Sequence, residues 1–320
     1  MRPRTIFMFS GQGSHYYQMG REIFEQNPVF RKWMLEGEKI VSGLIGVSII
    51  DQIYHNGYKK SDQFSRTLYT HPAIFLVEYA LAQAVMEMGI QPDYCLGASL
   101  GVFAAAALAD AVTFEAALTT VVRQAQAMEA LCSQGGMMAI LNPPALYFQN
   151  PLFHENCELA AINFPSHFVV SGGLKPLSDI QTFLEERKIT FQRLAVSHAF
   201  HSSLIDPAEV TYRNFLNTLV LREPRIPFIS CSDAHILPYI HRDYFWDTVR
   251  LPVQFQKTIQ SLEEHAEHAP YLYLDLGPSG TLASFVKYNL NHQSRSKSLS
   301  VLNPFGQEAK ALERLRSLMP

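Results

Sequence analysis

PDYCLGASLGVFAAAALAD, residues 92–110, is the stretch of sequence that decides the fold. Residues 92–96 form a short β-prone apolar run that stops at Gly97, and an alanine-rich run follows Gly101. Between them lies Gly-Ala-Ser-Leu-Gly, a GxSxG motif whose small residues permit a tight turn around Ser99. In a strand–turn–helix setting, this motif lifts the serine hydroxyl clear of the backbone and aims a helix N-terminus beside it. We therefore predict a nucleophile turn at residues 97–101.

Strand and helix continue to alternate on both sides of this turn. Residues 5–10 are a second β-prone run, which stops at Gly11-Gln12-Gly13, and residues 271–276 are a third. Apolar residues recur at helical spacing over residues 72–88 and again over residues 113–131. This alternation predicts an α/β layer fold with a largely parallel sheet.

The pattern changes between residue 135 and residue 200, where turns rich in Pro and Asn separate short elements. We expect strands over residues 137–141, 158–162, 167–171 and 190–196, and one helix over residues 177–187. These elements predict a small β-rich α+β insertion, after which the α/β pattern resumes.

The composition excludes several classes of protein. With 320 residues, of which 48% are hydrophobic and 17% charged, the chain can bury a large core and is not disordered. A formal net charge of −3 gives no overall attraction to nucleic acid or to an anionic membrane. Neither a signal peptide nor an apolar run near the ~18 residues of a membrane span is present, which predicts a cytoplasmic protein.

Neither a metal nor a cofactor is expected from the motifs. Gly11-Gln12-Gly13 is followed by no P-loop lysine and no GxGxxG pattern, and residues 264–268 (EHAEH) lack the HExxH spacing of a zinc site. The four cysteines lie far apart without CxxC spacing, so we expect free buried thiols.

A serine hydroxyl becomes an effective nucleophile only when a base takes its proton. Of the 12 histidines, those in residues 196–203 (VSHAFHSS) are the best placed, because the insertion returns to the larger part of the chain there. Spacing alone does not choose between His198 and His201.

Motifs along nearly the whole chain resemble those of the malonyl-CoA:acyl carrier protein transacylases and of the acyltransferases of polyketide synthases. In chain order they are FSGQGS (residues 9–14), THPA (70–73), GASLG (97–101), NFP (163–165), VSG (170–172), HAFH (198–201), PVQF (252–255) and LGP (276–278). The resemblance implies an α/β-hydrolase-like large domain with a parallel sheet, formed by residues 1–132 and 201–320. A ferredoxin-like small domain would be inserted at residues 133–200.

The resemblance also implies roles for individual residues. Ser99 would be the nucleophile and His201 its base, with a backbone carbonyl near Thr248 orienting the imidazole. Gln12 and the amide of Leu100 would form the oxyanion hole. Ser99 would attack a thioester, carry the acyl group as an ester and release it to an acceptor. The residues implied to bind the acyl substrate are Asn163, His198 and Phe200.

At residue 124 the sequence departs from this pattern. Malonyl-transferring relatives have an arginine about 25 residues past the serine, where it binds the free carboxylate through two hydrogen bonds. Counting without gaps places Gln124 there, and the adjacent Arg123 should face elsewhere because one helical residue turns about 100°. Glutamine cannot neutralise a carboxylate, so a malonyl group should bind poorly and uncharged acyl groups should gain room.

Loss of this arginine resembles the trans-acting acyl hydrolases of polyketide assembly lines, as does the run FMFSGQGSHYYQMG at residues 7–20. The sequence therefore favours a hydrolase that cleaves non-carboxylated acyl thioesters from an acyl carrier protein. Two alternatives stay open: an acyl- or malonyl-CoA:acyl carrier protein acyltransferase, including one for a non-carboxylated unit, and a catalytically silent docking subunit. The access of water to the pocket separates hydrolysis from transfer, and the sequence does not show it.

Overall fold

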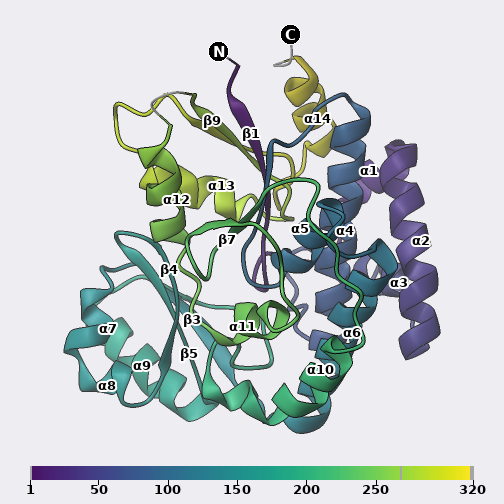
Figure 1. The fold of residues 1–320 in the computed structure, drawn as a ribbon. Coiled ribbons are helices and arrows are strands. Elements are labelled where there is room, and N and C mark those ends of the chain that lie inside the picture. The colour runs from purple at the N-terminus through teal and green to yellow at the C-terminus, as the bar shows by residue number, and fades with distance from the viewer. Residues whose placement is uncertain (1, 267–268, 318–320) are drawn as a thin grey trace.

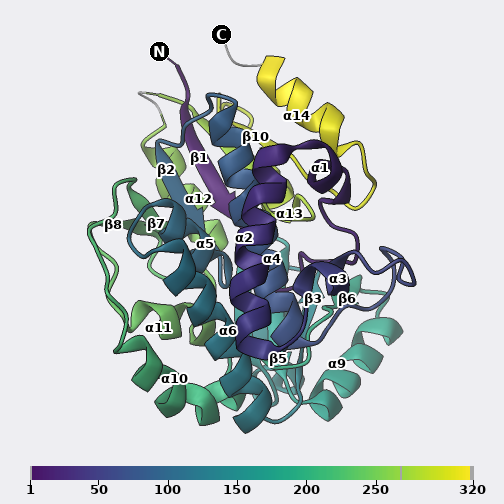
Figure 2. The same ribbon diagram turned by 90° about the vertical axis from the view of Figure 1, so that its right-hand side faces the viewer.

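The computed structural model describes residues 2–266 and 269–317. Its larger sheet has six strands in the order β10-β9-β1-β2-β7-β8 (Figures 1 and 2). Neighbouring strands are parallel except for the antiparallel edge pair β7 and β8, which confirms the predicted largely parallel sheet. The strands are β1 (Arg4–Phe9), β2 (Tyr94–Gly97), β7 (Phe228–Ser230), β8 (His235–Leu237), β9 (Tyr271–Asp275) and β10 (Lys297–Ser300).

Helices cover both faces of this sheet. Figure 1 shows α4, α5 and α6 on one side of β1, with α12 and α13 on the other. The covering helices are α2 (Pro28–Ile45), α4 (Thr67–Glu87), α5 (Gly101–Leu108), α6 (Phe114–Leu131), α12 (Phe255–Glu264) and α13 (Thr281–Asn289). Shorter elements complete this part: α1 (Arg21–Gln26), α3 (Ile49–Ile53), η1 (Ser203–Ala208), α10 (Glu209–Leu216), α11 (Tyr244–Arg250) and α14 (Glu308–Ser317).

Helix α4 begins at Thr67, five residues before the predicted start, so that Pro72 lies inside it. The carboxylate of Glu129 on α6 accepts a hydrogen bond of 2.9 Å from the Leu68 backbone N–H, which satisfies one of the donors at the helix start. Helix α4 packs against α2, α5 and α6, and most of its residues are buried. This packing offsets the loss of the backbone hydrogen bond that Pro72 cannot donate.

The smaller sheet is antiparallel, with the order β4-β5-β3-β6. Along the chain the elements run strand, helices, strand, strand, helix, strand, which is the ferredoxin-like arrangement. They are β3 (Gly136–Ile140), α7 (Ala145–Gln149), α8 (Pro151–His154), β4 (Glu158–Phe164), β5 (His167–Gly172), α9 (Leu174–Glu186) and β6 (Phe191–Arg193). All lie within the segment 133–200 predicted for the insertion, whose boundaries remain a prediction.

The two sheets meet close to the predicted nucleophile turn. Phe9 and Gly97 are paired at the carboxyl ends of β1 and β2, so the turns that follow these two strands emerge side by side. Strand β4 of the smaller sheet forms a parallel bridge from Ala161 to Val253, which follows α11. The segments around residues 11, 99 and 253 therefore converge at one edge of the larger sheet.

All four cysteines are free, as expected, although Cys132 is half-buried rather than buried. Across the described ranges, no helix combines the length and the apolar character that crossing a membrane requires.

Candidate active site

Ser99 lies on the sharp turn between β2 and α5, with a backbone φ of 54°. The flanking glycines make this turn possible. A Cβ on Gly97 would lie 2.4 Å from Cα of Val102, and one on Gly101 would lie 2.1 Å from the carbonyl oxygen of Phe9. Both approaches involve backbone atoms, which cannot rotate aside. The structure thus confirms the strand–turn–helix setting predicted from the GxSxG motif.

Replacing Gly101 by alanine is expected to destabilise the protein by about 3 kcal/mol or more, because the new methyl group would overlap backbone atoms of β1. The matched control is Gly43→Ala in α2, where an added Cβ meets nothing within 4 Å. An alanine in a helix should stabilise there by up to about 1 kcal/mol. Denaturant unfolding measures both, and equal midpoints for the two variants would contradict the described packing.

His201 contacts the serine directly. The distance between Ser99 Oγ and His201 Nε2 is 2.8 Å, although the two residues are 102 positions apart. The His201 imidazole is buried, and its backbone φ of 60° is again in the left-handed region. Of the two histidines between which spacing could not choose, His201 therefore pairs with Ser99.

The other imidazole nitrogen identifies the carbonyl that orients the ring. His201 Nδ1 donates to the carbonyl oxygen of Leu251 at 2.7 Å, which leaves Nε2 free to accept the serine proton. The prediction of Thr248 is therefore wrong by three residues. Thr248 lies inside α11, which ends at Arg250, and Leu251 is the extended residue directly after it.

The pKa of His201 is lowered to about 4, mainly by burial and also by the positive charge of Arg250, while the bond to Leu251 opposes both effects. At neutral pH the ring is uncharged and can act as a base towards Ser99.

The turn after β1 packs against the nucleophile turn. A Cβ on Gly11 would lie 2.8 Å from Cβ of Ser99 and 3.3 Å from the backbone nitrogen of Leu100. The Gln12 side chain donates to Thr70 Oγ1 at 2.9 Å, so its backbone N–H is the group that it can offer to a substrate. Within the described residues, the backbone N–H groups of Gln12 and Leu100 have no acceptor. That these two groups form the oxyanion hole stays a prediction.

A cavity of about 250 Å³ opens beside Ser99 and His201, between the two sheets. Its described lining holds no Asp, Glu, Lys or Arg side chain. The lining includes Phe200 and Asn163, as predicted for the acyl site. Its apolar wall is formed by Met137, Ala139, Ala161, Val169, Leu194, Phe200, Val253, Leu282 and Phe285.

Two of the predicted substrate-binding residues do not line this cavity. His198 Nδ1 lies 2.9 Å from Thr67 Oγ1 and is turned to α4. Gln124 is fully buried on α6, where its side chain contacts Tyr212 on α10. The placement of both residues on the cavity wall therefore needs correction. Arg123 is exposed and bonds to Gln126, as the helical rotation predicts.

Sequence reasoning missed several cavity residues that strand alternation could have found. On β3, Met137 and Ala139 face the cavity, whereas Met138 and Ile140 face the core of the smaller sheet. His167 and Val169 on β5 follow the same period of two. Burial lowers the pKa of His167 to about 4, so this imidazole is also uncharged at neutral pH.

Residues 267 and 268 of the EHAEH stretch lie outside the described residues. Among the residues that the structure does describe, no group of three or more His, Cys, Asp or Glu side chains could hold a metal ion.

Comparison with known proteins identifies the family. Residues 6–319 match the acyl transferase domain. The chain is 45% identical over 312 residues to the polyketide biosynthesis acyltransferase homolog PksD of Bacillus subtilis, covering 98% of this chain and 95% of that one. It is 44% identical over 315 residues to the homolog BaeD of Bacillus velezensis, covering 98% and 96%.

The fold agrees with solved structures of the same kind. The acyltransferase domain from the second module of the salinomycin polyketide synthase superimposes with a TM-score of 0.85 at 29% identity, covering 98% of this chain and 72% of that one. An α/β-hydrolase-like large domain and a ferredoxin-like small domain are common to both, as predicted. The chain therefore belongs to the acyl transferase domain family, alongside relatives from polyketide biosynthesis.

Proposed function

We propose that the protein is an acyl-[acyl carrier protein] hydrolase of polyketide biosynthesis, which cleaves non-carboxylated acyl thioesters through an ester on Ser99. The observation that carries this proposal is the cavity beside Ser99 and His201, whose described lining offers no charged side chain. The reaction needs a nucleophile, a neutral base and a site for the acyl group, and these three lie together there.

In the first half-reaction, His201 Nε2 takes the Ser99 proton as Oγ attacks the thioester carbonyl. The backbone N–H groups of Gln12 and Leu100 would stabilise the negative oxygen of the tetrahedral intermediate. The C–S bond then breaks, and the imidazolium returns its proton to the leaving thiolate. In the second half-reaction, the same imidazole activates a water molecule, which releases the acyl group as a free acid and restores the Ser99 hydroxyl.

An uncharged lining selects against a carboxylated acyl group. A malonyl carboxylate in this cavity would lose hydration and find no cation in exchange. Both lining imidazoles, His167 and His201, are uncharged at neutral pH, because burial lowers the pKa of each to about 4. Acetyl and longer alkyl chains contact the apolar wall without this cost.

Hydrolysis rather than transfer is supported by Gln12. Its side-chain oxygen is buried, and none of the described protein groups donates a hydrogen bond to it. Gln12 also lines the cavity beside Ser99. Buried amide oxygens are normally hydrogen-bonded. In this proposal a water molecule bonds to this oxygen and attacks the Ser99 ester.

The second candidate is an acyl-CoA:acyl carrier protein transferase, which the names of the relatives PksD and BaeD favour. An assay with acetyl-, malonyl- and longer acyl-loaded carrier proteins separates the two by intact mass. We expect free acid and unloaded carrier protein from the non-carboxylated substrates. Accumulation of the acyl group on a second carrier protein, with no free acid, would exclude hydrolysis.

Gln124→Arg should increase malonyl loading of Ser99 about tenfold or more, which corresponds to one charge-assisted hydrogen bond of about 1.5 kcal/mol. Because Gln124 lies off the cavity wall, the arginine side chain would have to extend past the position of the amide to reach the malonyl carboxylate. Gln126→Arg is the control, since it adds the same charge to α6 at a partly exposed position. Intact-mass analysis of Ser99 follows the loading, and a thermal melt checks the fold. Equal malonyl loading in both variants would contradict the assignment of residue 124.

A further inference from the structure

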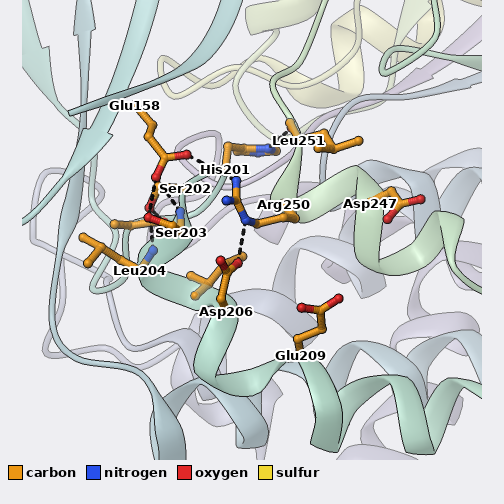
Figure 3. A network of polar contacts seen from close by, with 12 residues as sticks. Glu158, His201, Ser202, Ser203, Leu204, Asp206, Glu209, Asp247, Arg250 and Leu251 are labelled. Atoms are coloured by element: carbon orange, nitrogen blue, oxygen red, sulfur yellow. Dashed lines mark hydrogen bonds and ion pairs between the residues drawn. The ribbon is translucent and has the colours of Figure 1, made fainter. Parts of the chain in front are cut away.

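An ion-pair chain lies beside the catalytic histidine. Arg250 Nε is 2.5 Å from Asp206 Oδ1, and Arg250 Nη1 is 3.3 Å from Glu158 Oε2. Figure 3 shows the guanidinium between the two carboxylates, with His201 and Leu251 next to it. Arg250 is partly buried, with 24% of its side chain exposed.

Glu158, at one end of these ion pairs, holds the backbone that follows His201. The second oxygen of Glu158, Oε1, accepts hydrogen bonds of 2.6 Å from both the backbone N–H and the hydroxyl of Ser203. Ser203 is only two residues past His201, so Glu158 fixes the exit of the histidine segment.

Arg250, in the middle of these ion pairs, adjoins the carbonyl groups that contact His201. Arg250 directly precedes Leu251, whose carbonyl accepts from His201 Nδ1. It directly follows Val249, whose carbonyl accepts from the His201 backbone N–H at 2.8 Å. His201 is therefore bonded to the residues on both sides of Arg250.

These ion pairs also join the smaller sheet to helical segments of the larger part of the protein. Glu158 is the first residue of β4 in the smaller sheet, whereas Arg250 ends α11 and Asp206 lies in η1. The Glu158–Arg250 pair thus connects the smaller sheet to the segment that orients the imidazole.

We propose that Arg250 is a positioning residue for His201, which holds the Leu251 carbonyl in place through its ion pairs with Glu158 and Asp206 and sets the charge beside the imidazole. This inference rests on the proposed function, because it takes His201 as the base. Partly exposed ion pairs contribute little to folding stability, so the effect is expected on the imidazole rather than on the fold.

The charged groups beside the imidazole come from three elements: Arg250 from α11, Glu158 from β4 and Asp206 from η1. Arg250 opposes protonation of His201 and lowers its pKa. Without the guanidinium, the pKa of His201 rises. As the pH falls, the imidazole of the variant is therefore protonated at a higher pH than the imidazole of the parent protein.

The test is the rate at which a fluorophosphonate probe labels Ser99, measured against pH by intact mass. The probe needs the Ser99–His201 pair but no carrier protein. For Arg250→Gln, we expect labelling to slow 10- to 100-fold at neutral pH, as a misplaced base requires, and the acid limb of the profile to move to higher pH. The proton resonance of His201 Nδ1–H should shift as its bond to Leu251 changes.

The matched control is Arg213→Gln. Arg213 also bridges several carboxylates, those of Glu209, Asp243 and Asp247, but it does not adjoin the Leu251 carbonyl. This variant should label like the parent protein. Arg250→Lys keeps the charge without the guanidinium fork, so it should keep the acid limb in place while labelling more slowly than the parent.

The outcomes separate the two proposals. If the parent protein is not labelled at Ser99, the proposed function fails, and this inference fails with it. If the parent is labelled and Arg250→Gln matches Arg213→Gln in rate and pH profile, only the positioning role is overturned. Should Arg250→Gln fail to fold, Glu158→Gln takes its place, because it removes the carboxylate charge that pairs with Arg250 while its amide oxygen can still accept the bonds from Ser203. If Glu158→Gln is labelled more slowly than the parent and its His201 Nδ1–H resonance is shifted, the positioning role is supported. If its labelling rate and its resonance both equal those of the parent, the role is rejected.

Discussion

Replacing Ser99 by alanine is expected to abolish the acyl-enzyme and to lower the rate of thioester cleavage at least about 1000-fold. The physical reason is that Ser99 Oγ is the hydroxyl that lies 2.8 Å from His201 Nε2, where the imidazole can take its proton. Intact-mass measurement after brief mixing with an acyl-loaded carrier protein gives both quantities, the mass of the ester on the enzyme and the loss of acyl group from the carrier. Undiminished turnover by Ser99→Ala would contradict covalent catalysis altogether.

The histidines supply the companion variants. His201→Ala should lose about as much activity as Ser99→Ala, and the double variant should lose little more, because the two groups act as one unit. His198→Ala should lose less than about tenfold, since His198 contacts Thr67 rather than the serine. Equal losses at the two histidine positions would mean that the geometry of the HAFH segment is not the one described.

The second large effect is a steep fall in stability as the pH drops from 6.5 to 4. Burial lowers the pKa of His15 and His201 to about 4 and that of His71 to about 3, from an ordinary value of 6.5. Within this window the unfolded chain binds protons that the folded protein excludes, so unfolding becomes more favourable as the pH falls. Each histidine adds a slope of about 1.4 kcal/mol per pH unit. Burial also lowers the pKa of His167 to about 4, so the four together add about 5.5 kcal/mol per pH unit.

Denaturant unfolding at a series of pH values measures this slope. His71→Leu should reduce it by about a quarter while leaving stability above pH 7 nearly unchanged, because neither ring nitrogen of His71 has a hydrogen-bond partner to lose. His235→Gln is the control, since His235 is exposed in the folded protein. If the unfolding free energy of His71→Leu depends on pH as steeply as that of His235→Gln, His71 does not titrate as its burial requires.

The sequence predicted the reacting pair because the necessary information is local. A strand, two glycines around Ser99 and a helix are consecutive in the chain, and the motifs around His201 repeat a known order. The ferredoxin-like insertion was predictable for a similar reason, since its short strands are separated by turn residues.

What could not be predicted depends on contacts between distant segments. Every residue has a backbone carbonyl, so nothing in the residue type distinguishes Leu251 from Thr248, and only the end of α11 decides between them. The direction in which each side chain of α6 points depends on packing against α4 and α10, and this packing places Gln124 off the cavity wall. The pairing of Glu158 with Arg250 joins residues 92 positions apart and leaves no local signal.

The left-handed backbone at Ser99 and His201 means that the most stable version of this protein is not the working one. At φ values of 54° and 60°, a side chain costs about 1–2 kcal/mol that glycine would avoid. Glycine at Ser99, where the side chain is small and half-buried, should therefore raise the melting temperature while removing the hydroxyl. A laboratory selection for heat resistance alone would enrich such inactive variants, so thermostabilised libraries of this protein must be screened for turnover at the same time.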